Sequence, residues 1–408
     1  MSAPADVVPP DSANKSSSKV MFVVASFNPG SCGVSDYLVR LIGGLAGNGV
    51  QSVVVSIAQR HKGESRANVG SLVGAEVHRF TSRGATTQEI LQLRDTVAPA
   101  VISFQFASFY GFNRKGLPVS RRLQLLGRLA GRCPLHIMFH EIWLEPSAQG
   151  TLRRRVIGMW QRYAVQRMIR ALRPAQTHTT TIEYQTKLRR AGIEAHLTRL
   201  CGNVPFSFSA AGWTREQLAG HFIGDGRPAA EPWIFGLFGT IHPDCDLEPF
   251  METVELASRT ADRRAIIVSI GAAGAVGGNN LAVAVARHAE RVSLVVLGKQ
   301  SAARISDFLQ TVDWGLATTA WGRCGKSSTV ATMLDHGLPV LALQPPAKGE
   351  IIFQEMDSPL LRRFFRGEGP IWEKMSRGIP QDSVERLARQ FIAEVIPAGH
   401  IDSPASSR

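Results

Sequence analysis

The sequence has few cysteines and no long apolar run, and each shortage excludes a class of protein. Only 5 of the 408 residues are cysteine, and none of them forms a Cys-x-x-Cys pair. This argues against a disulfide framework and against a zinc site. No apolar run approaches the roughly 18 residues that a membrane-spanning helix needs. Residues 1–19 are rich in Pro, Ser and Ala and lack the apolar core of a signal peptide, so we expect a cytoplasmic protein.

The composition indicates a globular chain that is long enough for two domains. Hydrophobic residues make up 44% of the sequence and charged residues 19%, which is typical of proteins with sizeable cores. Two halves rich in alternating strands and helices, residues 19–205 and 233–380, are separated by a Gly/Pro/Ala-containing connection over 206–232. We expect residues 1–18 to form a disordered tail and residues 399–408 a second polar tail.

The net charge of +13 is concentrated in one region. Between Tyr110 and Arg190 there are 16 Lys and Arg against three acids, and the difference, 16 − 3 = +13, equals the excess of the whole chain. The region is either a solvated basic face or a contact with an anionic surface, such as phospholipid headgroups, a polyprenyl-phosphate acceptor or an acidic polysaccharide. Nucleic acid is the least favoured partner, because no recognition module is present and Tyr and Trp are not interleaved with the charges.

The segment 121–132 within that region predicts a basic amphipathic helix. Four leucines recur among four arginines at helical spacing. Such a helix either lies on an anionic membrane, which would place the protein at the inner face of the membrane, or packs on the sheet as a surface helix.

Two places in the first half predict ligand contacts at the ends of strands. The strand 20–26 is followed by a Gly-containing loop, in which Gly33 lacks a Cβ and so lets backbone approach a ligand closely. The strand 101–106 carries Gln105 at its end, with Tyr110 and Asn113 shortly after. Ligands of open α/β sheets bind at the carboxyl ends of the strands, so we assign these three residues to the acceptor side.

A second strand of the first half ends in two residues suited to proton transfer. The apolar residues Leu135–Phe139 run directly into His140 and Glu141. His140 can hydrogen-bond a sugar or an acceptor hydroxyl, and Glu141 can act as a base or orient the histidine. The alternative is a purely structural His beside an acid.

The second half contains a candidate phosphate site. A strand over 314–320 leads into a Gly-rich turn with Gly325 and Lys326, and the helix-start residues Ser327, Ser328 and Thr329 follow. The free N–H groups and the dipole at a helix start favour an anion, and Lys326 adds a positive charge. The spacing of Gly271, Gly274 and Gly277 is not a dinucleotide fingerprint, and we expect a loop over 271–278.

Two families fit this phosphate site. Ala320–Ser327 satisfies the loose P-loop pattern [AG]-x4-G-K-[ST]. A P-loop usually opens its domain, however, whereas only residues 328–408 follow here, and the strand Pro339–Leu343 has no terminal Asp for magnesium.

The chain also resembles glycosyltransferase family 4, a retaining group with the GT-B fold. Three segments carry the resemblance. They are the helix that ends in Gly337-Leu338-Pro339-Val340, the opening strand, Gly-containing loop, helix and strand over 20–57, and Cys201–Pro205 with Asn203 at the turn. It implies an α/β protein with two facing Rossmann-like domains and parallel sheets around a cleft. The N-terminal domain (19–205) would bind the acceptor, the C-terminal domain (233–380) the nucleotide sugar, and a helix over 381–398 would cross back.

The resemblance also implies which residues hold the donor. They are Gly33, which approaches the diphosphate, the turns at Gly239-Thr240 and Gly298-Lys299, and the helix start Gly325, Lys326, Ser327, Ser328 and Thr329. Neither a tightly bound divalent cation nor a cofactor is implied, because the nucleotide sugar is a substrate. Two departures stand out: Thr240 replaces the phosphate-binding Arg of the family, and Cys324 and Thr332 occupy the two positions of its Glu-x7-Glu motif.

The function that we expect is metal-independent transfer of a sugar from a nucleotide-sugar donor to a glycan or lipid-linked acceptor in polysaccharide or cell-envelope biosynthesis. The family resemblance implies retention of the anomeric configuration. The missing Glu pair leaves inversion open, with Glu141, His140 or Asp36 as the base. The same departure leaves open a catalytically silent GT-B-like protein that binds a glycan or nucleotide, and the P-loop pattern leaves an ATPase as a further alternative.

Overall fold

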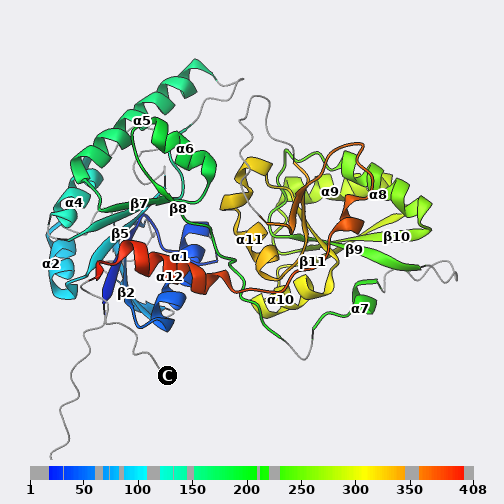
Figure 1. Cartoon of the computed structure of the whole chain (residues 1–408), viewed down its shortest axis with the longest axis horizontal. Coiled ribbons are helices and arrows are strands. Elements are labelled where there is room, and N and C mark those ends of the chain that lie inside the picture. Colours follow the sequence, from blue (N-terminus) through cyan, green and yellow to red (C-terminus); the bar gives the residue numbers. More distant parts are fainter. Residues whose placement is uncertain are drawn as a thin grey trace, which may run out of the picture.

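The computed structural model describes residues 18–30, 32–59, 68–72, 74–81, 87–107, 120–131, 133–144, 151–208, 212–219, 230–344 and 358–398. These residues form two lobes, each built around one sheet (Figure 1). The tails predicted over 1–18 and 399–408, apart from Ser18, lie outside the described residues, as do Tyr110 and Asn113.

The first lobe contains an 8-stranded sheet of order β3-β4-β2-β1-β5-β6-β7-β8. β3 pairs antiparallel with β4, and the other pairings are parallel. The strands are β1 (Lys19–Val24), β2 (Gln51–Gln59), β3 (Asn68–Leu72), β4 (Ala75–Thr81), β5 (Val101–Phe106), β6 (Leu135–Phe139), β7 (Gln176–Thr179) and β8 (His196–Leu197). β1 and β5 are buried along almost their whole length, as expected of central parallel strands.

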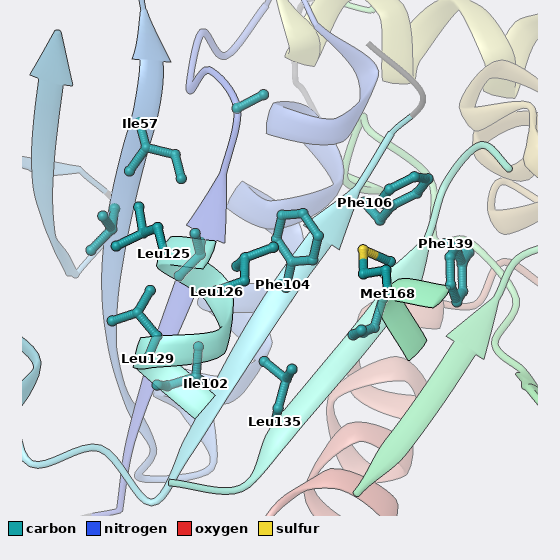
Figure 2. Close-up of a cluster of buried hydrophobic side chains, with 14 of the residues drawn as sticks. Ile57, Ile102, Phe104, Phe106, Leu125, Leu126, Leu129, Leu135, Phe139 and Met168 are labelled. Carbon is teal, nitrogen blue, oxygen red and sulfur yellow. The ribbon is translucent and has the colours of Figure 1, made fainter. Parts of the chain in front are cut away.

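Helices cover both faces of this sheet. α1 (Gly33–Gly47) and α12 (Ser383–Val395) lie on one face, and α2 (Thr87–Val97), α4 (Ser120–Ala130), α5 (Leu152–Leu172) and α6 (Ile182–Arg190) belong to the rest of the lobe. Figure 2 shows Leu125, Leu126 and Leu129 of α4 among side chains of the sheet. These leucines are 8%, 0% and 0% exposed. The basic amphipathic helix therefore packs its apolar face on the sheet, and that face is not available to a membrane.

The second lobe contains a 6-stranded sheet of order β11-β10-β9-β12-β13-β14, in which every pairing is parallel. Its strands are β9 (Ala230–Phe238), β10 (Arg263–Ile270), β11 (Val292–Gly298), β12 (Trp314–Ala317), β13 (Val340–Ala342) and β14 (Leu361–Arg363). Its helices are α8 (Glu248–Thr260), α9 (Ala275–Arg287), α10 (Ala302–Thr311) and α11 (Ser328–Asp335), with 3-10 helices η1 (Trp321–Lys326) and η2 (Ile371–Lys374).

Two boundaries differ from the sequence prediction. The loop expected over 271–278 ends at Gly274, and α9 begins at Ala275, because Gly277 without a Cβ lets the helix contact the carbonyl of Ile241. β9 begins at Ala230, before the domain start expected at residue 233, and the connection before it contains the short helix α7 (Arg215–Ala219).

The last helix, α12, returns from the second lobe to the first (Figure 1). Its buried residues, among them Leu387 and Phe391, join the core beneath α1. At Gly44 of α1 the two helices approach so closely that an added Cβ would lie 2.7 Å from Val384 Cγ1. Arg40 hydrogen-bonds the carboxylate of Asp382 at 3.1 Å and fixes the end of the contact.

Gly44→Ala should weaken the docking of α12. Overpacking a tight helix contact costs about 1–3 kcal/mol, so amide exchange in α12 should speed up and the free energy of unfolding should fall. The matched control is Gly47→Ala in the same helix, where an added Cβ meets no atom within 4 Å. That variant should be neutral or more stable by about 0.4–1 kcal/mol, and equal effects of the two would contradict the close contact.

Candidate functional site

The start of α11 exposes backbone donors. Ser327 caps the helix: its Oγ accepts from Val330 N at 3.4 Å and lies 2.9 Å from Thr329 Oγ1. The amides of Ser328 and Thr329 belong to the first turn and have no carbonyl partner within the helix. With the helix dipole they form the donor set that an anion prefers. These residues are only partly buried.

The turn that precedes α11 does not have the character of a P-loop. Trp321–Lys326 is a 3-10 helix in which Arg323 N donates to Ala320 O at 2.8 Å and Ser327 N donates to Cys324 O at 3.0 Å. A P-loop instead directs its amides outward to cradle phosphates. Because these amides are used within the turn, the geometry does not favour the ATPase alternative.

Lys326 reaches across to the first lobe. Its Nζ donates to Tyr184 Oη at 2.9 Å and lies 5.1 Å from the centroid of the same ring. Tyr184 is held at the start of α6 by Thr181, whose Oγ1 accepts from Tyr184 N at 3.0 Å. Among the described residues no carboxylate pairs with Lys326, so its partner is neutral and its charge is available to an anion.

Three glycine turns line the carboxyl edge of the second sheet next to α11. Gly239 has φ +81°, and a Cβ there would lie 2.8 Å from Thr329 Cγ2. Gly239 N donates to Ile270 O at 2.9 Å, and Gly271 N donates to Gly298 O at 2.7 Å. Gly239, Gly298 and the α11 start are thus brought to one edge, with the side chains of Thr240 and Lys299 exposed beside them.

The start of α9 is a part of this edge that the sequence analysis missed. Gly274, with φ +79°, occupies its N-cap position, and a Cβ there would lie 3.8 Å from Thr240 Cγ2. A second helix N-terminus therefore faces Thr240, where the family has an Arg. The buried residues Leu281, Ala284 and Val285 follow at helical spacing, which could have indicated the helix.

In the first lobe, His140, Gln105 and the start of α1 come together. His140 Nε2 lies 2.8 Å from Gln105 Oε1, and its ring meets Tyr37 edge-on at 5.0 Å. Tyr37 lies one turn after Gly33, which is exposed at the first position of α1. Burial lowers the pKa of His140 to about 3. The imidazole is therefore neutral at physiological pH. Glu141 is exposed.

The topology places His140 and the contact between Lys326 and Tyr184 at one edge of the first sheet. β6 and β7 are parallel neighbours, and His140 follows the carboxyl end of β6. Tyr184 stands in the first turn of α6, directly after β7. Because the carboxyl ends of parallel strands lie side by side, Lys326 contacts the same edge of the first sheet that carries His140.

Asp36, which the sequence analysis considered as a base, is engaged in its own loop. Its Oδ1 accepts from Gly30 N at 2.6 Å. Its position at the start of α1 suits a first-turn acid.

The two positions of the Glu-x7-Glu motif are buried. Cys324 is 1% exposed and Thr332 is 0% exposed. Thr332 Oγ1 accepts from Asn203 N at 2.9 Å, and the neighbouring Asp335 accepts from Gly202 N at 2.9 Å. Thr332 therefore joins the end of the first lobe to α11 rather than facing a ligand.

Among the described residues, no group of three or more His, Cys, Asp and Glu side chains could hold a metal ion. Within the same residues, none of the helices combines the length and the apolarity needed to cross a bilayer.

Comparisons with known proteins identify the fold. No protein-family model and no curated protein sequence matches the chain. It is similar to the structure of a glycosyltransferase from Rickettsia africae, with 10% identity and a TM-score of 0.50 over 92% of this chain and 88% of that one. The catalytic domain of starch synthase IV from Arabidopsis thaliana, bound to ADP and acarbose, follows with 10% identity and a TM-score of 0.48 over 94% and 97%.

A UDP-GlcNAc 2-epimerase from Methanocaldococcus jannaschii is also similar, with 10% identity and a TM-score of 0.45 over 92% of this chain and 99% of that one. At such identities the likeness concerns the fold and not the reaction. The chain thus has the α/β fold of the GT-B type, with two lobes of parallel strands, as the sequence predicted.

Proposed function

We propose that the protein is a glycosyltransferase that moves a sugar from a nucleotide-sugar donor to a glycan or lipid-linked acceptor in polysaccharide or cell-envelope biosynthesis. The observation that carries this proposal is the position of Lys326. Lys326 directly precedes Ser327, the N-cap of α11, whose Thr329 adjoins the Gly239 turn. The ammonium of Lys326 donates to Tyr184 of the lobe that carries His140. A pyrophosphate on the amides of Ser328 and Thr329 would be reached by this ammonium.

The proposed reaction breaks the bond between the anomeric carbon and the diphosphate oxygen. The nucleoside diphosphate leaves with the electron pair, and the acceptor oxygen forms the new bond to the anomeric carbon. Helix dipole, backbone amides and Lys326 would stabilise the charge on the leaving group, which is the role that a divalent metal plays elsewhere. Gly298 and Lys299 would face the nucleobase, and the open turn at Gly33 would approach the diphosphate.

His140 is the proposed group for the acceptor proton. Since its imidazole is neutral and its Nε2 is engaged with Gln105, the free ring nitrogen is Nδ1, which has no partner among the described residues. A neutral nitrogen with a free lone pair can accept the proton of an acceptor hydroxyl. Gln105 then orients the base, and Glu141 remains an exposed second candidate.

A second candidate function is a GT-B-like protein that binds a nucleotide or glycan without transfer. The burial of Cys324 and Thr332, where the family has carboxylates, favours it. Calorimetry with UDP, GDP and ADP, run beside a nucleotide-sugar hydrolysis screen, separates the two candidates. Nucleotide binding with no turnover of any donor would support the silent protein.

We also propose that the first lobe associates with an anionic membrane through α5, in place of the helix 121–132. Five large apolar side chains of α5 lie on one side of the helix and are 46–76% exposed: Leu152, Val156, Met159, Trp160 and Tyr163. The helix contains six arginines and no acid. An apolar stripe among arginines suits insertion between anionic headgroups.

Lys326→Ala should reduce turnover by about 10²-fold or more, which is typical of losing one charge-stabilising group. The affinity for the nucleoside diphosphate should fall as well. Arg323→Ala, an exposed cation three residues earlier, should change neither. Tyr184→Phe removes only the phenol oxygen and tests whether the contact between the lobes matters apart from the charge. A normal rate in Lys326→Ala would remove the lysine from the mechanism.

His140→Gln should lower turnover by about 10²-fold, the usual contribution of a positioned base. The pH profile of the wild type is an independent measurement. A base with a pKa of about 3 is already unprotonated at about pH 5, so activity should stay level from about pH 5 to 7. Loss of activity through pH 6.5 as the pH falls would instead indicate an ordinary histidine.

The double substitution Met159→Gln/Trp160→Gln should weaken binding to phosphatidylglycerol vesicles by at least about tenfold. Each buried side chain of this size contributes roughly 1.5–3 kcal/mol. Binding of the wild type should also decrease with salt, because the arginines act through screened charges. Leu256→Gln, which alters an apolar side chain that is 68% exposed on α8, serves as the control. Equal binding of both variants would exclude α5 as the membrane surface.

A further inference from the structure

A chain of side-chain hydrogen bonds runs through the first lobe from the candidate site to α12. Ser103 and Gln105 stand on β5, His136 on β6 and His178 on β7. His140 follows the end of β6, and Glu394 stands on α12, which covers this face of the sheet. The chain comprises, in order, His140, Gln105, Ser103, His136, His178 and Glu394. The successive heavy-atom distances are 2.8, 2.7, 2.8, 3.0 and 2.6 Å.

The interior of this chain is closed to water. Ser103 is 0%, Gln105 2%, His136 2% and His178 1% exposed. The ring of Phe391 on α12 packs edge-on against His136 at 5.4 Å. Glu394 is the more open end, since its side chain is 36% exposed. Gln390 on the same helix donates to Glu394 Oε1 at 3.2 Å.

The donors and acceptors fit only one direction along the chain when Glu394 is ionised. The carboxylate can only accept, so His178 must donate from Nε2 and leave Nδ1 bare. His136 then donates from Nε2 to His178 Nδ1, and its own Nδ1 accepts the Ser103 hydroxyl. Ser103 accepts from the Gln105 amide, whose Oε1 accepts from His140 Nε2. Each histidine carries one proton, on Nε2.

Burial supports the neutral state of these three imidazoles. It is the largest cause that lowers the pKa of His136, His140 and His178. The ionised Glu394 raises the pKa of His178 in opposition, and the ring of His196, 5.5 Å away, lowers it. In a chain of neutral imidazoles, all hydrogen bonds can point toward Glu394 or all can point away from it. The group at the end of the chain selects between these two arrangements.

We propose that Glu394 of α12, acting through His178, His136, Ser103 and Gln105, fixes the tautomer of His140 so that Nδ1 is left unprotonated at the candidate site. Glu394 is then a positioning residue for a base that stands at the opposite end of the chain. Because Glu394 is carried by the helix that returns from the second lobe, the docking of α12 is coupled to the proton-accepting capacity of His140. The assignment of His140 as the base rests on the proposed function, whereas the tautomer itself does not.

A substitution at Glu394, the end of the chain, should reverse the direction of its hydrogen bonds. Glu394→Lys places an ammonium, which can only donate, beside His178 Nε2. His178 would then donate from Nδ1, His136 would do the same toward Ser103, and the Gln105 amide would turn and donate to His140 Nε2. The proton of His140 would move to Nδ1, where it blocks acceptance of a proton from an acceptor hydroxyl.

The test is nitrogen-detected NMR of full-length protein labelled with ¹⁵N-histidine, which reports the nitrogen that carries the proton in each ring. Signals are assigned from single His→Gln variants. The wild type near pH 7 should show His136, His140 and His178 all protonated on Nε2. Glu394→Lys should move the proton of all three to Nδ1. Glu394→Gln, whose amide can donate or accept, should give a mixture of both forms.

Glu385→Lys supplies the control, because it makes the same charge change in the first turn of the same helix, away from the chain. It should leave the three tautomers unchanged. Wild-type His140 protonated on Nδ1, or an unaltered His140 in both Glu394 variants, would overturn the inference.

Kinetics separate the inference from the proposed function. Glu394→Lys should lower kcat by at least about tenfold with little change in the donor KM, while Glu394→Gln should retain roughly half of the wild-type kcat. A reversed tautomer with unchanged kcat would support the coupling and remove His140 as the base. Unchanged tautomers with reduced kcat would contradict the coupling and leave the proposed function intact.

Discussion

The docking of α12 on the first sheet is the contact on which the arrangement of the molecule depends. The helix leaves the second lobe, buries an apolar side beneath α1 and meets it at Gly44, where no Cβ intervenes. A returning helix closes the chain into two lobes whose relative position is set by side-chain packing rather than by the length of the connection. The same helix carries Glu394 to His178, so an apolar contact and a buried polar chain share one surface.

One polar contact between the lobes, that of Thr332, lies where the family resemblance places a carboxylate that grips the donor. Thr332 holds the Asn203 amide, and Asp335 holds the amide of Gly202. A hydroxyl or carboxylate that is buried and hydrogen-bonded in this way contributes to the interface but cannot grip a sugar. The proposed site for a nucleoside diphosphate consists of backbone amides and one lysine. Such a site relies on dipoles and a single ammonium, and it is suited to a leaving group whose charge grows during the reaction.

The basic helices α4 and α5 of the first lobe have different roles. The arginines of α4 accompany leucines that face the sheet, so the helix serves the core (Figure 2). On α5 four residues are buried, Gly158, Gln161, Val165 and Met168, while Leu152, Val156, Met159, Trp160 and Tyr163 are exposed. A basic region of the sequence thus contains one helix that stabilises the fold and one that offers a surface to a partner.

Periodicity and turn residues in the sequence were enough to predict β1, β2, β5, β6, β12 and β13, because buried apolar runs and glycine turns are local signals. The same signals predicted the helix start at Ser327 and placed His140 at the end of a strand. They missed α9, since its glycine-rich start resembles a loop until Ile241 is packed against it. The contact of Lys326 with Tyr184 joins residues 142 positions apart, and the contact of His178 with Glu394 joins residues 216 positions apart. The outward face of α5 depends on which of its residues the rest of the lobe buries. Tertiary structure alone decided them, because hydrogen bonds and burial between distant segments leave no pattern in the local sequence.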